Sequence, residues 1–217
     1  MLEILFIRHG QTEWNSKRHV MGRRPIPLNE TGRSQAEGVA KYLENVQIDV
    51  LRASPVERAL ETARIIASRH KGLDVEQDES FIEIDYGDWV NCTFDELPIK
   101  FADEWSKYRT DTAGAAFSGG ESMKAAAARI TAGVDRLLKM AEVERAVVVA
   151  HADVLKIALV HVLGIEMKYM GRFGIDNCAV VLVRLAKDAG PRLIIANTSM
   201  GFGRDIRISE AVSSAKS

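Results

Sequence analysis

Apolar and polar residues follow one another along the chain in blocks whose lengths predict strands and helices in turn. Strand-like runs lie at 2–7, 48–51 and 146–150, and a short strand is expected near 74–76. Segments 178–185 and 192–197 form an expected β-hairpin, and helical spacing predicts helices at about 31–44, 55–69, 122–142 and 153–163. This order predicts an α/β fold, a three-layer α/β/α sandwich with a mostly parallel central sheet and one antiparallel edge.

Segment 78–120 breaks this alternation. Its helical signals are limited to about 93–97, where Thr93 and Glu96 have the spacing of a capping box, and 103–108. A long irregular stretch is either functional or a structural excursion, and the pattern alone does not decide between these interpretations. No repeat or linker divides the chain, so we expect a single domain over 1–217, with a frayed tail at about 209–217.

Two predicted strands end in side chains suited to an anion. Arg8, His9 and Gly10 follow the first strand, and His151 directly follows the strand at 146–150. In open α/β sheets ligands bind at the carboxyl ends of the strands, and an arginine beside a histidine suits a phosphoryl group. Gly10 would let a ligand approach the backbone. For Arg8, His9 and Gly10 alone, an ordinary polar strand end is an equally good interpretation.

The helix after the second strand begins with its own set of signals. Ser54 is the expected N-cap, Pro55 the first helical residue, and Glu57 the third member of a capping box. Arg58 then lies in the first turn, where free backbone N–H groups already favour an anion. The alternative is a solvated helix arginine.

Glu83 lies in a loop-like stretch, 81–89, that mixes acids with large apolar residues. It has an isoleucine on each side, a setting that raises the pKa of a carboxyl group toward the range of a proton donor. Taken alone, this signal is weak.

Composition narrows the class of protein. The net charge is -1, which argues against a nucleic-acid or membrane-surface partner, and no apolar run is long enough to span a bilayer. The 2 cysteines indicate no disulfide framework, and Cys178 is expected to be a small buried residue within its strand. The first strand begins at Met1-Leu2, so we expect no signal peptide and a cytoplasmic protein. No cluster has the spacing of metal ligands, so we expect no metal.

The chain resembles the histidine phosphatase superfamily, also called the phosphoglycerate mutase-like proteins, over residues 1 to about 197. The most specific matches are RHGQTEWN at 8–15, PLNETGRSQA at 27–36 and SPVERALETA at 54–63. Weaker matches are 83–89, 120–122 and the strand that leads into His151. In this family the segment that corresponds to 78–120 forms a cap over the substrate.

The resemblance implies a mechanism without cofactor or metal. His9 would be the nucleophile that forms a phosphohistidine, and two nearby arginines would disfavour its protonated form. Glu83 would be the general acid and then the general base. The phosphoryl oxygens would be held by Arg8, Arg58, Asn15 and His151.

Three departures from the family bear on the substrate. The loop 17–24 carries four cations, which either hold a second anionic group of the substrate or are simply solvated. Arg23 and Arg24 are therefore candidate substrate-binding residues, as is Gly10. Pro25 stands where many relatives have an aspartate. Asp153 is expected to cap the following helix; otherwise it would project into the pocket and select against acidic substrates.

The resulting expectation is a metal-independent phosphatase that hydrolyses a small phosphorylated metabolite. The first alternative is a cofactor-dependent phosphoglycerate mutase, which Ile84 and Asp85 disfavour because mutases carry basic residues close after the acid. The second is a non-catalytic module that binds a phosphorylated ligand. Sugar phosphates, phosphoserine, a cobalamin-pathway nucleotide ester and protein phosphohistidine remain open as substrates. The oligomeric state is open as well, a homodimer included.

Overall fold

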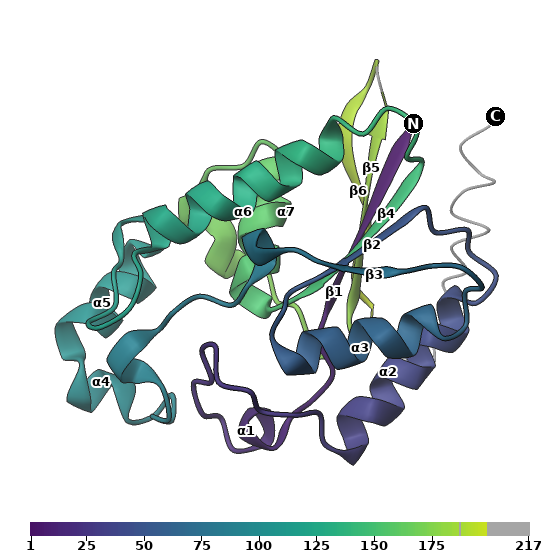
Figure 1. Ribbon diagram of the computed structural model, residues 1–217. Coiled ribbons are helices and arrows are strands. Elements are labelled where there is room, and N and C mark those ends of the chain that lie inside the picture. The colour runs from purple at the N-terminus through teal and green to yellow at the C-terminus, as the bar shows by residue number, and fades with distance from the viewer. Residues whose placement is uncertain (187, 199–217) are drawn as a thin grey trace.

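A computed structural model of the protein describes residues 1–186 and 188–198 (Figure 1). Its centre is a six-stranded sheet of order β3-β2-β4-β1-β5-β6. The pairs β1–β4, β4–β2 and β2–β3 are parallel, whereas β1–β5 and β5–β6 are antiparallel, which confirms the predicted sheet. The strands are β1 Leu2–Arg8, β2 Val50–Ala53, β3 Val75–Gln77, β4 Arg145–Ala150, β5 Val180–Ala186 and β6 Gly190–Thr198.

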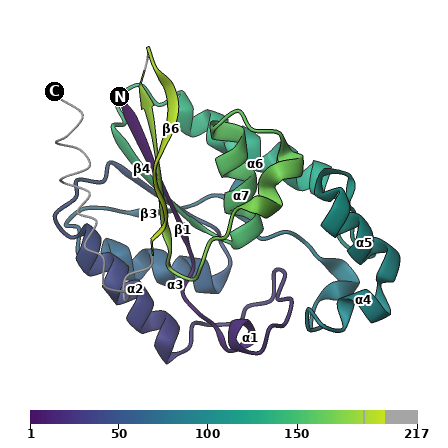
Figure 2. The ribbon, with the colours of Figure 1, turned by 180° about the vertical axis from the view of Figure 1, so that it is seen from behind.

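Helices cover both faces of the sheet (Figures 1 and 2). Both faces of the sheet need a cover because the strands are apolar on both sides. In β1, for example, successive side chains point to opposite faces. Leu5 and Ile7 join the core beneath α2 (Glu30–Leu43) and α3 (Glu57–Ala67). Ile4 and Phe6 join the core beneath α6 (Met123–Leu138) and α7 (Ala152–Val162). All four β1 side chains are fully buried, so the sheet has a dry core on each side, as the three-layer prediction requires.

Residues 78–120, here called the cap segment, extend away from the sheet at its carboxyl end, beyond the short helix α1 (Glu13–Ser16) (Figure 1). Trp89 holds this segment together, because its buried ring contacts the rings of Phe101, Trp105, Tyr108 and Phe117. The helical elements of the cap segment are η1 Glu79–Phe81, η2 Gly87–Trp89, α4 Leu97–Lys100, α5 Ala102–Thr110 and η3 Thr112–Gly114. A further 3-10 helix, η4 (Met167–Arg172), follows α7.

Several boundaries differ from the predictions. β2 begins at Val50 rather than 48, and α6 ends at Leu138 rather than 142. Thr93 and Glu96 do exchange hydrogen bonds, but they form a turn before α4 instead of starting a helix. Cys178 is buried as expected, yet it lies in a turn with φ of 54° before β5 rather than in the strand.

The capping prediction for α3 was wrong. The N-cap is Val56, which makes no side-chain capping bond, and the helix begins at Glu57. Ser54 is withheld from capping because its hydroxyl accepts the Val56 N–H and contacts His151. Arg58 nevertheless lies in the first turn, as predicted. The tail at 209–217 lies outside the described residues, and the single-domain assignment stays a prediction. No helix among the described residues is both long and apolar enough to cross a membrane.

Candidate active site

His9 follows the carboxyl end of β1, and its imidazole is neutral, with the lone pair on Nε2. Its Nδ1 lies 2.7 Å from the Gly10 carbonyl oxygen, which can only accept, so Nδ1 carries the proton. Nε2 then bears the lone pair, and it accepts a hydrogen bond from Arg58 Nε at 3.2 Å. Burial, together with the charges of Arg58 and Arg8, holds the pKa of His9 well below its usual value. Nε2 of His9 therefore carries its lone pair without any prior deprotonation.

Arg58 and His151 are fully buried and both contact the His9 ring. Arg58 donates to the carbonyl oxygen of Gly22 at 2.9 Å, and its Nη2 lies 3.1 Å from His151 Nδ1. Since a guanidinium only donates, His151 Nδ1 is the acceptor, and its Nε2–H donates to Ser54 Oγ at 2.7 Å. Burial and the charge of Arg58 lower the pKa of His151 well below its usual value, while burial lowers the pKa of Arg58 to about 10.

Glu83 comes from the start of the cap segment and faces this cluster. Its Oε2 lies 3.6 Å from both Arg58 Nη2 and His151 Nδ1, and its Oε1 accepts the Ile84 N–H at 2.9 Å. Burial raises the pKa of Glu83 to about 7, although Arg58 and the Ile84 N–H act in the opposite direction. The carboxyl group thus titrates in the range where it can both give and take a proton.

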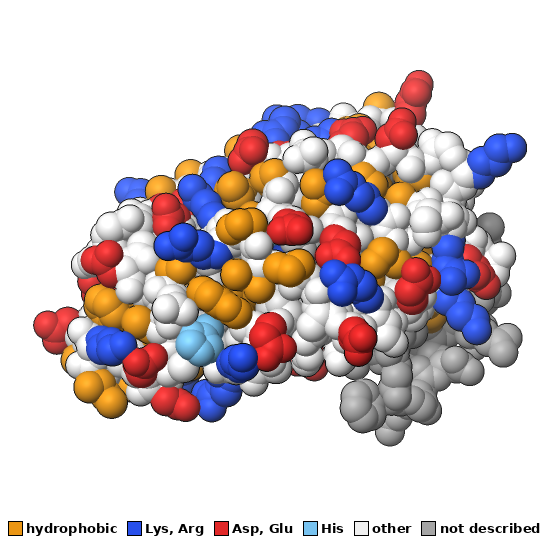
Figure 3. Space-filling model, turned by 60° about the horizontal axis from the view of Figure 1, so that its bottom comes forward, with side chains coloured by type: hydrophobic (Ala, Val, Ile, Leu, Met, Phe, Trp, Pro, Cys, Tyr) orange, Lys and Arg blue, Asp and Glu red, His pale blue; other side chains and the backbone are white. Residues whose placement is uncertain are grey.

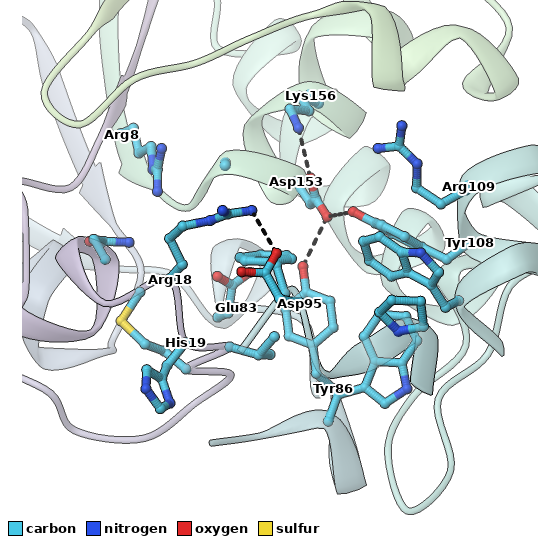
Figure 4. A pocket seen from close by; sticks show the side chains of 18 of the residues that line it. Arg8, Arg18, His19, Glu83, Tyr86, Asp95, Tyr108, Arg109, Asp153 and Lys156 are labelled. Atoms are coloured by element: carbon cyan, nitrogen blue, oxygen red, sulfur yellow. Dashed lines mark hydrogen bonds and ion pairs between the residues drawn. The ribbon is translucent and has the colours of Figure 1, made fainter. Parts of the chain in front are cut away.

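A cavity of about 840 Å³ lies between the sheet edge and the cap segment (Figure 4). The fully buried Arg58 and His151 do not line it and reach it only through their contacts with His9 and Glu83. Arg8, His9, Asn15 and Glu83 line its inner end. Arg8 Nη1 donates to the Ile175 carbonyl oxygen at 2.9 Å, while its buried Nε–H has no partner among the described residues. An unsatisfied buried donor in a cavity that His9 also lines suits an anionic oxygen such as that of a phosphoryl group. Asn15 Oδ1 already accepts the Thr12 N–H at 3.1 Å, so its amide nitrogen is the end suited to a ligand.

A family model described as the histidine phosphatase superfamily (branch 1) matches residues 4–198. The chain belongs to this superfamily. It is 28% identical to phosphoserine phosphatase 1 of Hydrogenobacter thermophilus over 185 residues, which are 85% of this chain and 87% of the relative. It is 32% identical to the probable phosphoglycerate mutase GpmB of Yersinia pestis over 181 residues, covering 83% of each. Among solved structures, a mycobacterial glucosyl-3-phosphoglycerate phosphatase superposes with a TM-score of 0.83 at 27% identity, covering 92% of this chain and all of that one. Membership in this superfamily, together with the phosphatase relatives, supports the assignment of the protein as a phosphoric monoester hydrolase.

Three of the four predicted substrate-binding residues, Gly10, Arg23 and Arg24, do not line this cavity, whereas Asn15 does. At Gly10 an added Cβ would lie 2.4 Å from the Gly32 carbonyl oxygen, so a glycine is needed where the chain packs against the start of α2. Arg23 is turned the other way, donating to the Glu83 carbonyl oxygen at 2.9 Å and to Glu121 at 3.1 Å. Arg24 is exposed, and its carbonyl oxygen accepts a hydrogen bond from Arg58 Nη1 at 3.1 Å.

Of the loop cations at 17–24, Arg18 alone lines this cavity, and it pairs with Asp95 of the cap segment at 3.4 Å. Lys17 pairs with Glu13 at 3.0 Å on the surface. Three of the four loop cations thus lie away from the cavity, which favours the solvated loop over a site for a second anionic group.

Asp153 is not a helix cap. The N-cap of α7 is His151, and the Asp153 side chain is buried against the cavity. Its carboxylate accepts hydrogen bonds from Tyr86 Oη at 2.9 Å and from Tyr108 Oη, and it pairs with Lys156 Nζ at 3.0 Å (Figure 4). Burial opposes its ionisation, but Lys156 and the two hydroxyls outweigh burial and keep the pKa of Asp153 below its usual value.

Sequence reasoning missed two groups that support the cluster. Ser54 fixes His151, and it could have been recognised because it follows β2 at the same sheet edge as His9 and His151. Asn177 donates to the His9 carbonyl oxygen at 3.0 Å from a turn before β5, and no sequence pattern marks it. Within the described part of the chain, no group of three or more His, Cys, Asp or Glu residues could hold a metal ion.

Proposed function

We propose that the protein is a metal-independent phosphatase that hydrolyses a small phosphorylated metabolite through a phosphohistidine on His9. The observation that carries this proposal is the neutral His9, whose Nδ1–H is bonded to the Gly10 carbonyl oxygen and which lines one cavity together with Arg8 and Glu83. A cytoplasmic location stays part of the proposal.

In the first step, His9 Nε2 attacks phosphorus and the bond from phosphorus to the leaving oxygen breaks. Glu83, protonated below its pKa of about 7, gives its proton to that oxygen. Arg58 Nε, now bonded to Nε2, turns to a phosphoryl oxygen as the N–P bond forms, and Arg8 holds another through its free Nε–H. Asn15 adds the N–H groups of its side-chain amide. His151 acts by holding Arg58, because its Nδ1 accepts from Arg58 and its only N–H is bonded to Ser54. Positioning and electrostatic stabilisation supply most of the catalysis in such a transfer.

In the second step, water attacks the phosphohistidine. The Glu83 carboxylate takes the water proton, the N–P bond breaks, and inorganic phosphate leaves. His9 returns to its neutral form and Glu83 to its protonated form, so the cycle closes without metal or cofactor.

A phosphoglycerate mutase is the second candidate, because curated relatives at about a third identity carry that name. In a mutase the phosphoryl group returns to the substrate rather than to water. Here Glu83 is followed by Ile84 and Asp85 rather than by cations that would hold a bisphosphorylated intermediate.

The test is a side-by-side measurement of phosphate release from simple monoesters and of isomerisation of 3-phosphoglycerate with added 2,3-bisphosphoglycerate. We expect phosphate release that persists in EDTA, little isomerisation, and loss of both in His9→Ala. His161→Ala is the matched control, since His161 is partly exposed on α7 and pairs with Asp135 outside the cavity. Efficient isomerisation would favour the mutase, and ligand binding without any turnover would favour a non-catalytic module.

A further inference from the structure

The outer part of the cavity is an aromatic wall supplied by the cap segment. Only 6% of the chain is aromatic, yet two of its 3 tryptophans lie here. We define the aromatic wall as Tyr86, Trp89, Phe94, Trp105 and Tyr108. Such side chains offer large flat faces for packing at low cost in conformational entropy.

The wall is packed before any ligand arrives. The Trp105 ring centroid lies 5.9 Å from that of Trp89, 6.1 Å from that of Tyr108 and 6.4 Å from that of Phe94. Trp89 is buried beneath them and contacts Phe117 edge-on at 4.8 Å. A ring entering the cavity therefore meets a surface that does not have to be ordered on binding.

The cations of the cavity outside its inner end already have partners. Lys156 pairs with Asp153, Arg18 pairs with Asp95, and the Arg109 guanidinium lies over the Trp105 ring, 5.8 Å from its centroid. A carboxylate on the leaving group would compete with Asp153 for Lys156 and with Asp95 for Arg18, and the ionised Asp153 in the cavity wall would repel it. The surface at this end of the molecule likewise mixes Lys, Arg, Asp and Glu side chains around hydrophobic ones, with neither sign of charge dominant (Figure 3).

The volume of the cavity and the hydrogen-bonding groups in its wall also indicate a large, uncharged leaving group. A cavity of about 840 Å³ is near the upper end of the range, about 300–1,000 Å³, of sites that enclose drug-sized molecules. A three-carbon phosphate ester would leave the aromatic wall unused. Tyr86 and Tyr108 both donate their hydroxyl hydrogens to Asp153, so their oxygens can only accept from a ligand (Figure 4).

We propose that the substrate is a phosphate monoester of a bulky, uncharged alcohol that carries a flat aromatic ring. This inference rests on the phosphatase function proposed above. The phosphoryl group sits at His9 and Arg8, the ring packs on Trp105 and Phe94, and a hydroxyl or N–H of the leaving group donates to Tyr86 or Tyr108.

The experiment compares kcat/KM for esters whose leaving groups are all alkyl alcohols, so that leaving-group chemistry changes little. The series is ethyl phosphate, 2-phenylethyl phosphate, 2-(2-naphthyl)ethyl phosphate, O-phosphoserine and 3-phosphoglycerate. We expect kcat/KM to rise at least about tenfold from ethyl to naphthylethyl phosphate, the gain typical of one stacked ring, and to stay low for the two acids.

Two variants test the aromatic wall itself. Trp105→Ala should reduce the naphthylethyl-to-ethyl ratio of kcat/KM about tenfold. Phe94→Ala should reduce it as well, and because Phe94 is 41% exposed this variant keeps the test valid if Trp105→Ala does not fold. Ile99→Ala is the matched control, since Ile99 is 82% exposed on α4 of the same cap segment and should leave the ratio unchanged.

The outcomes separate the two proposals. Equal rates across the series, or faster hydrolysis of O-phosphoserine than of naphthylethyl phosphate, would overturn the ring-bearing substrate while leaving the phosphatase intact. A ratio unchanged in both wall variants would do the same. Failure to hydrolyse any ester would overturn the phosphatase, and the substrate class with it.

Discussion

Replacing Glu83 by glutamine should stabilise the folded protein at alkaline pH while it damages catalysis. The folded protein holds this carboxyl at a pKa of about 7 because burial disfavours the charged form, whereas its ordinary value is 4.5. The folded state therefore binds this proton more tightly than the unfolded state does. Its contribution to stability is fully present below pH 4.5 and is lost as pH rises through about 7.

The magnitude follows from the gap between the two pKa values. At about 1.4 kcal/mol per pKa unit, the interval from 4.5 to about 7 corresponds to about 3 kcal/mol of stability lost between pH 4.5 and pH 8. Glutamine has nearly the same shape and no charge to desolvate. The difference in unfolding free energy, Glu83→Gln minus wild type, should thus increase by about 3 kcal/mol over that pH range.

Urea unfolding at pH 4.5, 6 and 8 measures this difference. Glu121→Gln is a control of opposite sign. Burial opposes ionisation of Glu121, but the hydrogen bonds from Arg129 and from the Asp85 N–H, together with the charges of Arg129 and Arg23, outweigh burial and lower the pKa of Glu121. That variant should therefore lose stability at pH 8. A Glu83→Gln difference that does not change with pH would refute the view that Glu83 is held protonated by burial.

The same substitution should slow hydrolysis of alkyl phosphates by about a hundred- to ten-thousand-fold, and para-nitrophenyl phosphate far less, because only the alkyl alcohol needs a proton to leave. For the wild type, kcat/KM on alkyl phosphates should fall about tenfold per pH unit above about 7. Equal losses on both substrates would remove Glu83 from the role of general acid.

Two further substitutions test the support of the site. Ser54→Ala removes the 2.7 Å hydrogen bond between His151 and the Ser54 hydroxyl. The variant should lower kcat about fivefold, the equivalent of about 1 kcal/mol, with KM little changed. A change confined to KM would contradict a positioning role for Ser54. Gly10→Ala places a Cβ against the Gly32 carbonyl oxygen and should destabilise the protein by about 3 kcal/mol, measured by thermal unfolding. An unchanged Tm would show that α2 can move aside.

The strands and the inner site were predictable because their signals are local. Ile4 to Ile7 form an unbroken apolar run, and whatever follows such a strand must emerge at the sheet edge, so Arg8 and His9 could be placed in advance. Arg58 followed equally from its position in the first turn of a helix.

The predictions that were wrong concerned side chains whose contacts are with segments distant in the sequence. Arg23 is turned from the cavity by Glu121, 98 residues later, and Asp153 is taken from capping by Tyr86, 67 residues earlier. The aromatic wall has no period of its own, since Phe94 and Trp105 meet only once the cap segment has folded. Sequence spacing carries no information about such pairings, so the substrate-facing half of the site came from the structure.

The central claim, that His9 carries the phosphoryl group, is tested most directly by trapping the intermediate. Purified protein is mixed with a phosphate monoester labelled with ³²P, quenched within milliseconds, and digested to locate the label. We expect a label on the peptide that contains His9, stable in base and labile in acid. The label should be absent from His9→Ala, which should also lack turnover. Turnover by His9→Ala near the wild-type rate, or a label on another residue, would contradict it.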